Sequence, residues 1–540
     1  MRVKKSLFLR RFAAALLAIL LLIPGWLSLS GLSLLAAFVP LLWISASYDG
    51  SRRAWWGMFG WATFVFAGWN LATIWWIGYA TPVGPVAATL ASTFLNLVAF
   101  MTFHTVSHAT NRTVGYVTLA AAWIATEYGY TVSDFSWPWL VLGNGFSHDV
   151  WAVQWYEFTG VFGGSLWVLA VNCLLFEALR RRTKRCWIAT ACTVALPLLV
   201  SLWAGHRAAR ETREALAAAD GTVRVSILQP NVDCYEKFNG GDAWQEANIH
   251  DLLTRVPADA DFILLPETAI PGYYNEPGLS PAFRAAEHPA AIWTRLADTL
   301  RAAHPRALLV TGANTIARYG RTKQTETARG NGGEYYDIFN TAVGLDSAGR
   351  TQLHHKGRLV IGVENTPTWV FDVLRFLVID LGGTLGQIGK GTHGTAFTHN
   401  GVTMGPAICY EGLYGDFYGD FVRGGAQFMA IVSNDGWWED TPGYRHLFTI
   451  SRLRAIEHRR AVARSANTGR SGFIAPDGSV GATLGWEERG VLTAEVPLLT
   501  RTTLYTRHGD WIARMACFVA LLAILYAIAY RVKRKNHLVP

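Results

Sequence analysis

The sequence predicts an integral membrane α-helical bundle of about eight spans joined to a separate α/β domain. Hydrophobic residues make up 51% of the 540-residue chain and charged residues only 16%, whereas soluble domains contain about 25% charged residues. Apolar stretches near the ~20 residues that cross a bilayer fill the first part of the chain and recur near its C-terminus. Between them lies a long polar region with short strand-like runs, which is typical of an α/β fold.

Seven apolar segments are predicted to cross the membrane before the polar region, and an eighth follows it. The segments lie at 12–30, 32–48, 55–78, 83–105, 114–130, 160–178, 187–204 and 511–530. Arg10 and Arg11 before the first segment also fit a signal peptide. No small-residue cleavage site followed by a polar start is visible, so we interpret this segment as a span.

Basic residues alternate between the loops that join these segments. They precede the first segment, follow the second, fourth, sixth and eighth, and are nearly absent from the other loops. By the positive-inside rule, this alternation predicts that both termini face the cytoplasm and that residues 205–510 lie outside. The 23 Trp residues suit a chain with many membrane–water interfaces.

The charge and cysteine content exclude several other classes of protein. The formal net charge is +9, but much of the Lys and Arg lies beside apolar segments, so we expect no nucleic-acid partner. The six Cys residues form no CxxC pair and no metal-ligand spacing. Only Cys234 and Cys409 lie in the polar region, so a disulfide framework is not expected.

The polar region is long enough to bury its own core. Short β-rich runs bounded by turn residues predict strands at 222–229, 261–266, 307–312, 339–345, 351–355, 403–409, 427–433 and 462–467. Helices are expected at 243–255, 281–303 and 445–460. Pro476-Asp477-Gly478 predicts a hairpin turn. The polar, Gly-rich segment 315–337 is expected to be a mobile insertion.

Three ionisable residues follow or close predicted strands, where α/β sheets usually place catalytic groups. They are Glu267, Lys356 and Cys409. A thiol attacks a carbonyl only as a thiolate, and a carboxylate can take its proton. An ammonium can stabilise the oxyanion that forms, together with the backbone N–H after the nucleophile. The three residues could therefore carry out acyl transfer through a thioester.

Each of these residues also has a plain structural reading. Cys409 alone is more often a small buried hydrophobe. Glu267 can cap a following helix, and Lys356 can be a solvated charge at a strand end. Composition and spacing alone leave these alternatives open.

The local context of the three residues resembles the nitrilase superfamily of carbon–nitrogen hydrolases. The similar motifs are 226–231, Leu-Pro-Glu-Thr at 265–268, Lys356 through Glu364, Ile-Cys-Tyr-Glu at 408–411 and Ser-Asn-Asp-Gly-Trp-Trp at 433–438. With eight predicted spans and the segments 137–143 and 505–511, the chain is identified as a member of the apolipoprotein N-acyltransferase family. The resemblance covers nearly the whole chain.

This resemblance implies a fold and domain limits. Residues 209–505 would form a nitrilase-like catalytic domain, an α-β-β-α sandwich outside the cytoplasm. Residues 1–208 would form the transmembrane bundle of seven spans. Residues 506–540 would form the last transmembrane helix and a basic cytoplasmic tail. The expected location is the bacterial inner membrane, with the catalytic domain on the periplasmic side.

The resemblance also implies catalytic roles for four residues. Glu267 would be the general base, Lys356 the oxyanion stabiliser and Cys409 the nucleophile. Tyr410 would lend its backbone N–H to the oxyanion hole. The separation of Glu267 and Lys356, 89 residues, is long for the family and implies an insertion near 315–337.

Four further residues are expected to support the site or bind substrate. Glu364 and Glu411 would be supporting carboxylates, although a surface salt bridge is the alternative for each. Trp437, like Trp438, would line the acyl pocket or rest at the interface. Phe238 stands where many members have Trp, and Ile361 replaces an expected Pro, so a lid contact and a loop depart from the family pattern.

The implied reaction has two steps and needs no metal or dissociable cofactor. Cys409 would take an acyl chain from a membrane phospholipid and pass it to the α-amino group of a diacylglyceryl-modified apolipoprotein. The enzymatic alternative is a membrane-tethered amidase or nitrilase that passes the acyl group to water. The non-enzymatic alternative is a membrane scaffold with a degenerate nitrilase-like domain.

Three other ionisable residues carry no assigned role. His354 and His355 adjoin Lys356, but one of two neighbouring strand residues usually points to solvent. Glu127 lies near the outer end of the fifth predicted span, where an ionisable group is either paired or functional.

Overall fold

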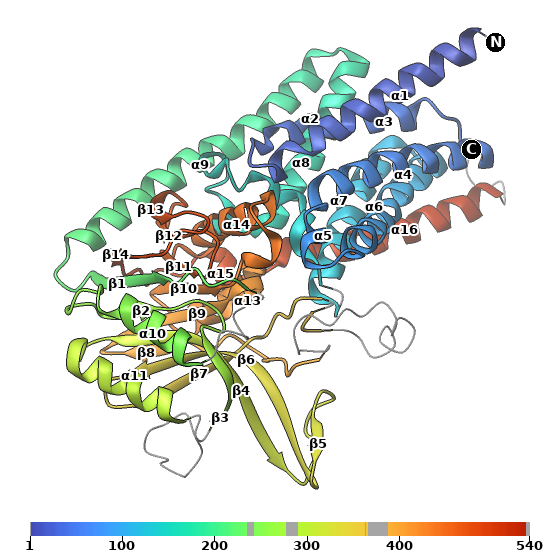
Figure 1. The fold of residues 1–540 in the computed structure, drawn as a ribbon. Helices are drawn as coiled ribbons and strands as arrows, with labels where there is room; N and C mark the ends of the chain where they lie inside the picture. The colour runs from blue at the N-terminus through green and yellow to red at the C-terminus, as the bar shows by residue number, and fades with distance from the viewer. Residues whose placement is uncertain are drawn as a thin grey trace. The chain divides into compact units, whose positions relative to one another are not determined.

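The computed structural model describes residues 2–134, 136–234, 242–276, 290–361, 363–365 and 387–535. The chain divides into two compact units. Met1–Gly205 and His508–Pro540 form the first unit, called the helical unit below, and His206–Arg507 form the second, called the catalytic unit. Figure 1 shows the helices and strands of both.

Each of the eight predicted membrane segments overlaps helical structure. The long helices are α1 (Arg2–Leu22), α4 (Arg52–Ile74), α6 (Gly84–Ala109), α7 (Arg112–Val132), α8 (Tyr156–Arg181), α9 (Lys184–Ala217) and α16 (Trp511–Lys535), and the second segment holds the short helices α2 (Leu34–Ala37) and α3 (Val39–Ala46). By length and composition, five helices in the described part of the chain could cross a membrane. They lie at Ser6–Trp26, Gly84–Ala109, Tyr156–Arg181, Lys184–Ala217 and Trp511–Lys535.

Two buried polar side chains of the helical unit, Asn172 and Glu127, bind backbone groups of neighbouring segments, as an apolar environment favours. The Asn172 side chain accepts hydrogen bonds from the backbone N–H groups of Phe38 and Val39 and donates one to the Leu34 carbonyl. Backbone groups near the start of α3 thus have hydrogen-bond partners. The Glu127 carboxylate accepts from Trp123 Nε1 at 3.0 Å and from the Leu142 N–H at 2.8 Å. Glu127 Oε1 therefore links α7 to the backbone of the segment after it.

The catalytic unit contains an eight-stranded and a six-stranded sheet in the described residues. The first sheet has the order β14-β1-β2-β4-β6-β5, with β3 beside β4 and β7 beside β6, and the second has the order β13-β12-β11-β10-β9-β8. The strands of the first sheet are β1 (Thr222–Gln229), β2 (Phe262–Leu264), β3 (Ile270–Asn275), β4 (Leu308–Gly320), β5 (Arg329–Asn331), β6 (Glu334–Asp346), β7 (Thr351–His355) and β14 (Gly490–Pro497). Those of the second are β8 (Phe397–His399), β9 (Val402–Ile408), β10 (Phe428–Ser433), β11 (Val462–Ala466), β12 (Ser471–Ile474) and β13 (Val480–Leu484).

Parallel strands form the centre of both sheets. In the first sheet β2 is parallel to β1 and β4, and in the second β10 is parallel to β9 and β11. Parallel neighbours end at the same edge of a sheet, so residues that follow them are brought together there. Glu267 follows β2, Cys409 follows β9 and Asn434 follows β10.

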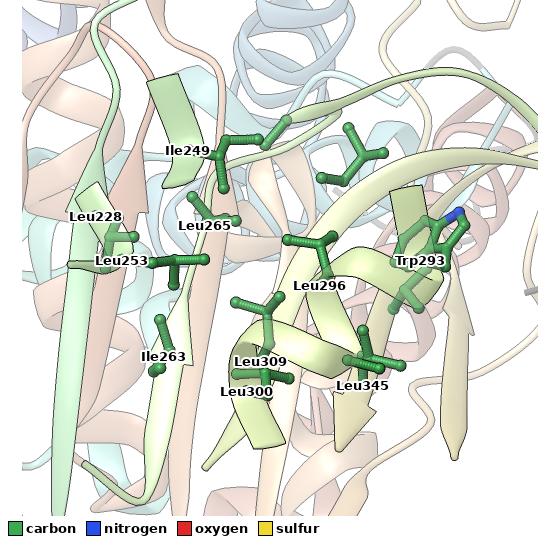
Figure 2. Packing of buried hydrophobic residues seen from close by; sticks show 14 of the residues in the cluster. Leu228, Ile249, Leu253, Ile263, Leu265, Trp293, Leu296, Leu300, Leu309 and Leu345 are labelled. Carbon is green, nitrogen blue, oxygen red and sulfur yellow. The ribbon is translucent and has the colours of Figure 1, made fainter. Parts of the chain in front are cut away.

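Helices cover one face of the first sheet and form its hydrophobic core. Figure 2 shows Leu228, Ile263, Leu265, Leu309 and Leu345 of the sheet packed among residues of two helices. The helices are α10 (Asp242–Leu253) and α11 (Ala290–Ala303), which contribute Ile249, Leu253, Trp293, Leu296 and Leu300. Burial of these apolar side chains is the main source of the stability of this layer.

The other face of the first sheet packs against the second sheet. The rings of Phe262 and Phe428 lie 5.1 Å apart across the two sheets, and Ser465 Oγ donates to the Leu228 carbonyl at 2.8 Å. Helices α13 (Gly415–Arg423) and α14 (Pro442–His458) adjoin the second sheet in Figure 1. The unit is thus the expected α-β-β-α sandwich.

The structure can be compared with two further sequence-based expectations, one for the turn Pro476–Gly478 and one for the segment 315–337. Pro476–Gly478 joins the antiparallel strands β12 and β13, as predicted. The segment 315–337, which was expected to be a mobile insertion, contains the end of β4, the strand β5 and the start of β6 at Glu334, while 321–328 lie outside the strands. Strands β4 and β6 pair from Leu308 to Gly320, so cross-strand hydrogen bonds compensate for the weak strand propensity of the residues.

A cavity at the centre of the first sheet should destabilise the catalytic unit. Leu309 is fully buried between β2 and β6. Leu309→Ala should lower the free energy of unfolding by about 2–5 kcal/mol, measured as loss of β-structure circular dichroism with denaturant. Thr398→Ala on the exposed edge strand β8 is the control and should change it by less than about 0.5 kcal/mol. Equal effects of the two variants would contradict this account of the core.

Candidate active site

Lys356 forms the centre of a buried cluster of charges between the two sheets. Its Nζ donates to Glu267 Oε1 at 2.8 Å and to Glu364 Oε1 at 2.9 Å. Asn340 Nδ2 donates to the same two oxygens, at 2.7 Å and 2.9 Å. The Lys356 side chain is 1% exposed, so these contacts replace nearly all of its hydration. Burial of an ammonium is tolerated only with such pairing.

Cys409 is presented by a sharp turn at the end of β9. Its backbone has φ of +46° although it is not a glycine, a conformation that costs about 1–3 kcal/mol. The residue begins the short helix Cys409–Leu413. Its thiol donates a hydrogen bond to the Glu267 carboxylate. The strained turn therefore places the nucleophile directly against the base.

The backbone beside Glu267 is fixed in a similar way. Thr268 also has φ of +46°. A Cβ at Gly312 on β4 would lie 2.2 Å from the Thr268 nitrogen and 2.7 Å from Glu267 Cα. Only glycine allows this close approach. The Asn434 N–H donates to Glu267 Oε2 at 3.2 Å, so both carboxylate oxygens are held.

The electrostatics of the cluster favour an ionised base and a neutral nucleophile. Burial raises the pKa of Glu267, but the charge of Lys356 and hydrogen bonds from Lys356 and Asn340 outweigh it, so the pKa lies below its usual value. Burial lowers the pKa of Lys356, but the two carboxylates raise it well above its usual value. Burial and the charge of Glu267 raise the pKa of the Cys409 thiol.

Glu411 lies beneath the nucleophile and is completely buried. Its Oε1 accepts from the Gly357 N–H at 2.6 Å and its Oε2 from the Ile408 N–H at 2.7 Å. Gly357 follows Lys356 and Ile408 precedes Cys409 in the chain. Glu411 is therefore a buried link between the two catalytic strands, and the surface salt bridge considered from the sequence is excluded.

Glu364 also lies in the cluster, although it is less buried. Its Oε2 accepts from the Val360 N–H at 2.9 Å, and its side chain is 15% exposed. The turn that carries it includes Ile361, which bridges to Asn365. The replacement of the expected Pro by Ile361 thus leaves Glu364 in contact with Lys356.

A second buried pair supports the loop after β10. Arg464 binds both oxygens of Asp435 at 2.8 Å and 2.9 Å, and both side chains are fully buried. Asn467 Nδ2 donates to Asn434 Oδ1 at 3.1 Å. These contacts hold the Asn434 amide against Glu267.

The remaining site residues predicted from the sequence are Tyr410, Trp437 and Phe238. Tyr410 is buried beside Cys409, and Trp437 is half-buried in the turn Gly436–Trp438. Phe238 lies outside the described residues. None of the six cysteines forms a disulfide in the structure. Cys234 lies against Gly436, where a Cβ would be 3.4 Å from its sulfur.

Two neighbours of the triad have no clear signal in the sequence. Asn340 lies in the middle of β6, where no motif marks it. His354 is completely buried and contacts Glu411. Asn434 belongs to the Ser-Asn-Asp-Gly motif, which could have indicated it. The triad was found because its members carry distinctive local motifs, whereas contacts across the two sheets leave no such mark.

Comparison with known proteins identifies both parts of the chain. Residues 224–504 match the model of the carbon-nitrogen hydrolase family. Residues 13–174 match the apolipoprotein N-acyltransferase N-terminal domain. Among solved structures, Saccharomyces cerevisiae Nit3, a member of branch 10 of the nitrilase superfamily, has 17% identity and a TM-score of 0.37, over 51% of this chain and 90% of that one.

Two relatives are similar over almost the whole chain. The apolipoprotein N-acyltransferase of Chlorobaculum tepidum is 29% identical, over 92% of each chain. That of Allorhizobium ampelinum is 30% identical, over 97% of each chain. The chain therefore belongs to the apolipoprotein N-acyltransferase family, as its motifs indicated, and its catalytic unit is a carbon–nitrogen hydrolase domain.

Proposed function

We propose that the chain transfers an acyl group from a membrane phospholipid to the α-amino group of the N-terminal diacylglyceryl-cysteine of apolipoproteins. The observation that carries this proposal is the cluster of Cys409, Glu267 and Lys356 in a chain whose helical part matches the N-terminal domain of these acyltransferases. The partners are thus a phospholipid donor, a lipoprotein acceptor and the bilayer.

In the first half-reaction, Glu267 takes the thiol proton as Cys409 Sγ attacks the ester carbonyl of the donor. The C–S bond forms, and the carbonyl oxygen becomes an oxyanion. Glu267 then returns the proton to the glycerol oxygen as its bond to the carbonyl carbon breaks. The products are a thioester on Cys409 and a lysophospholipid.

Lys356 and the Tyr410 N–H stabilise the oxyanion. An ammonium has three N–H donors, and two of those on Lys356 bind Glu267 and Glu364. The third is assigned to the oxyanion. Two carboxylates and one ammonium carry one net negative charge, and proton transfer to Glu267 keeps that charge constant as the oxyanion forms. The buried site therefore takes on no additional charge in the transition state.

In the second half-reaction, the α-amine of the acceptor attacks the thioester. Glu267 takes a proton from the amine nitrogen, the C–S bond breaks, and the proton passes to the Cys409 sulfur. The product is an amide, and the free thiol is restored. One carboxylate thus serves as base in both halves. The reaction is ping-pong because the lysophospholipid leaves the acyl-enzyme before the acceptor reacts with it.

Lipid substrates account for the union of this hydrolase-type fold with apolar helices. Moving one CH₂ group of an acyl chain from lipid into water costs about 0.8 kcal/mol. An enzyme that meets both substrates at the membrane avoids this cost. We further propose that the helical bundle has eight spans and lies in the bacterial inner membrane, with 209–505 as the periplasmic catalytic domain, and 1–208 and 506–540 as the membrane parts.

Reporter fusions should reveal the proposed topology. The alternation of basic loops predicts that Thr183 and the C-terminus face the cytoplasm and that Gly221 faces the periplasm. Alkaline phosphatase should therefore be active only when fused at Gly221. A fusion that is active at Thr183 or at the C-terminus would refute the arrangement of spans.

The rate of thioester formation should be nearly independent of pH between about 6 and 9. The lowered pKa of Glu267 keeps its carboxylate ionised as pH falls below the usual value of about 4.3, and the raised pKa of Lys356 keeps its ammonium above about 10.4. Single-turnover mass spectrometry with phospholipid measures the rate. Glu267→Gln, which lacks the base, should react slowly and speed up about tenfold per pH unit as thiolate forms. The same slope in the unmodified enzyme would contradict base catalysis by Glu267.

Enzyme given phospholipid alone should form about one thioester per chain and then stop, as ping-pong transfer requires. A diacylglyceryl peptide with a free N-terminal Cys should discharge the thioester as amide, and the same peptide with an acetylated amine should not. The ratio of amide to free fatty acid is the measurement. Steady release of fatty acid without acceptor, unaffected by the peptide, would establish the hydrolase alternative instead.

A further inference from the structure

His354 lies two residues before Lys356 on β7, and its side chain is completely buried. Its ring packs edge-on against Phe421 at 4.9 Å. Its Nε2 lies 3.0 Å and 3.2 Å from the two oxygens of Glu411. The residue touches no member of the Glu267–Lys356–Cys409 triad in these contacts, and it reaches the site through Glu411.

The second ring nitrogen fixes the tautomer of His354. The Thr395 N–H donates to Nδ1 at 3.3 Å. A nitrogen that accepts a hydrogen bond carries no proton, so the single proton of the neutral ring lies on Nε2. Nε2 therefore donates to the Glu411 carboxylate. The hydrogen bond from the Thr395 backbone thus selects the tautomer in which His354 Nε2 can donate to Glu411.

Glu411 needs this third donor to hold its geometry. Its two oxygens accept from the N–H groups of Gly357 and Ile408, which adjoin Lys356 and Cys409 on strands of different sheets. A carboxylate with two donors can still rotate or move along the line between them. The Nε2–H of His354 approaches both oxygens and removes this freedom.

We propose that His354 is a positioning residue for acyl transfer, which sets the separation of Lys356 and Cys409 by fixing Glu411. Glu411 in turn fixes the backbone next to each of them. Displacement of a reacting group by about 1 Å can cost about 10²-fold in rate. The inference rests on the proposed function only in taking Cys409 as the nucleophile. The alternative to this proposal is that His354 only packs against Phe421 and accepts a hydrogen bond from the Thr395 backbone.

Two amide substitutions separate these roles because each keeps one of the two hydrogen bonds. In His354→Gln, Nε2 of glutamine replaces the ring Nε2 and can still donate to Glu411. In His354→Asn, Oδ1 of asparagine replaces the ring Nδ1 and can still accept from Thr395. Both variants lose the ring contact with Phe421. His355→Asn is a matched control, since His355 bonds to Glu276 at 2.7 Å instead.

Two rates are measured on the full-length enzyme in detergent. One is single-turnover thioester formation with phospholipid, resolved into its maximal rate constant and the phospholipid concentration that gives half of it. The other is alkylation of Cys409 by iodoacetamide at fixed pH, which needs neither lipid substrate. His354→Asn should lower the maximal rate constant about 10²-fold with little change in the half-saturating concentration, and should alter Cys409 alkylation. His354→Gln and His355→Asn should stay within about threefold of the unmodified enzyme, a small change in free energy.

The opposite pattern would overturn the proposal. If His354→Gln is impaired as much as His354→Asn, or if His354→Asn is as active as the unmodified enzyme, then the bond to Glu411 has no positioning role. Thermal melting identifies a variant that fails to fold. If His354→Asn does not fold, alkylation of folded His354→Gln still decides, because a changed rate there contradicts the proposal. A third outcome is that Cys409 alkylation changes in His354→Asn while the unmodified enzyme does not react with lipid. That outcome would reject the lipid substrates and keep the positioning role.

Discussion

The ion pair between Lys356 and Glu267 is the interaction on which the rest of the site depends. Both groups are buried, and an isolated buried charge would cost several kcal/mol. Two carboxylates, Asn340 and the Asn434 amide supply the compensating contacts. Lys356, Glu267 and Asn340 lie on or directly after strands of the first sheet, whereas Asn434 follows β10 of the second. The contacts of Asn434 and Cys409 with Glu267 therefore require the two sheets to be packed together.

The sequence predicted the parts of the site that depend on local order along the chain. Glu267, Lys356 and Cys409 each follow or close a strand, and β1 and β7 have the predicted bounds. It did not predict Asn340, which lies in the middle of β6 with no motif around it, or the contact of His354 with Glu411, which depends on how the two sheets face each other. Of the two neighbouring histidines, His354 is fully buried and His355 is 27% exposed, in line with the expectation that one of the pair points toward solvent.

The segment 315–337 shows a related limit of local reasoning. Its Gly and charged residues indicate a loop when each is considered alone. In the structure, residues 315–320 extend β4 and residues 334–337 begin β6, whereas 321–328 lie outside the strands. The hydrogen bonds of a long ladder can outweigh weak propensity at its end.

The catalytic residues themselves do not choose between an amine and water as the acceptor, because Glu267 can take a proton from either. The choice then depends on which acceptor is held near the thioester. An acceptor that carries its own acyl chains is confined to the membrane surface, where a tethered group reaches an effective concentration in the millimolar range or above. Water gains nothing from such confinement. We therefore infer that the apolar helices, rather than any change in the triad, direct a hydrolase-type site toward acyl transfer.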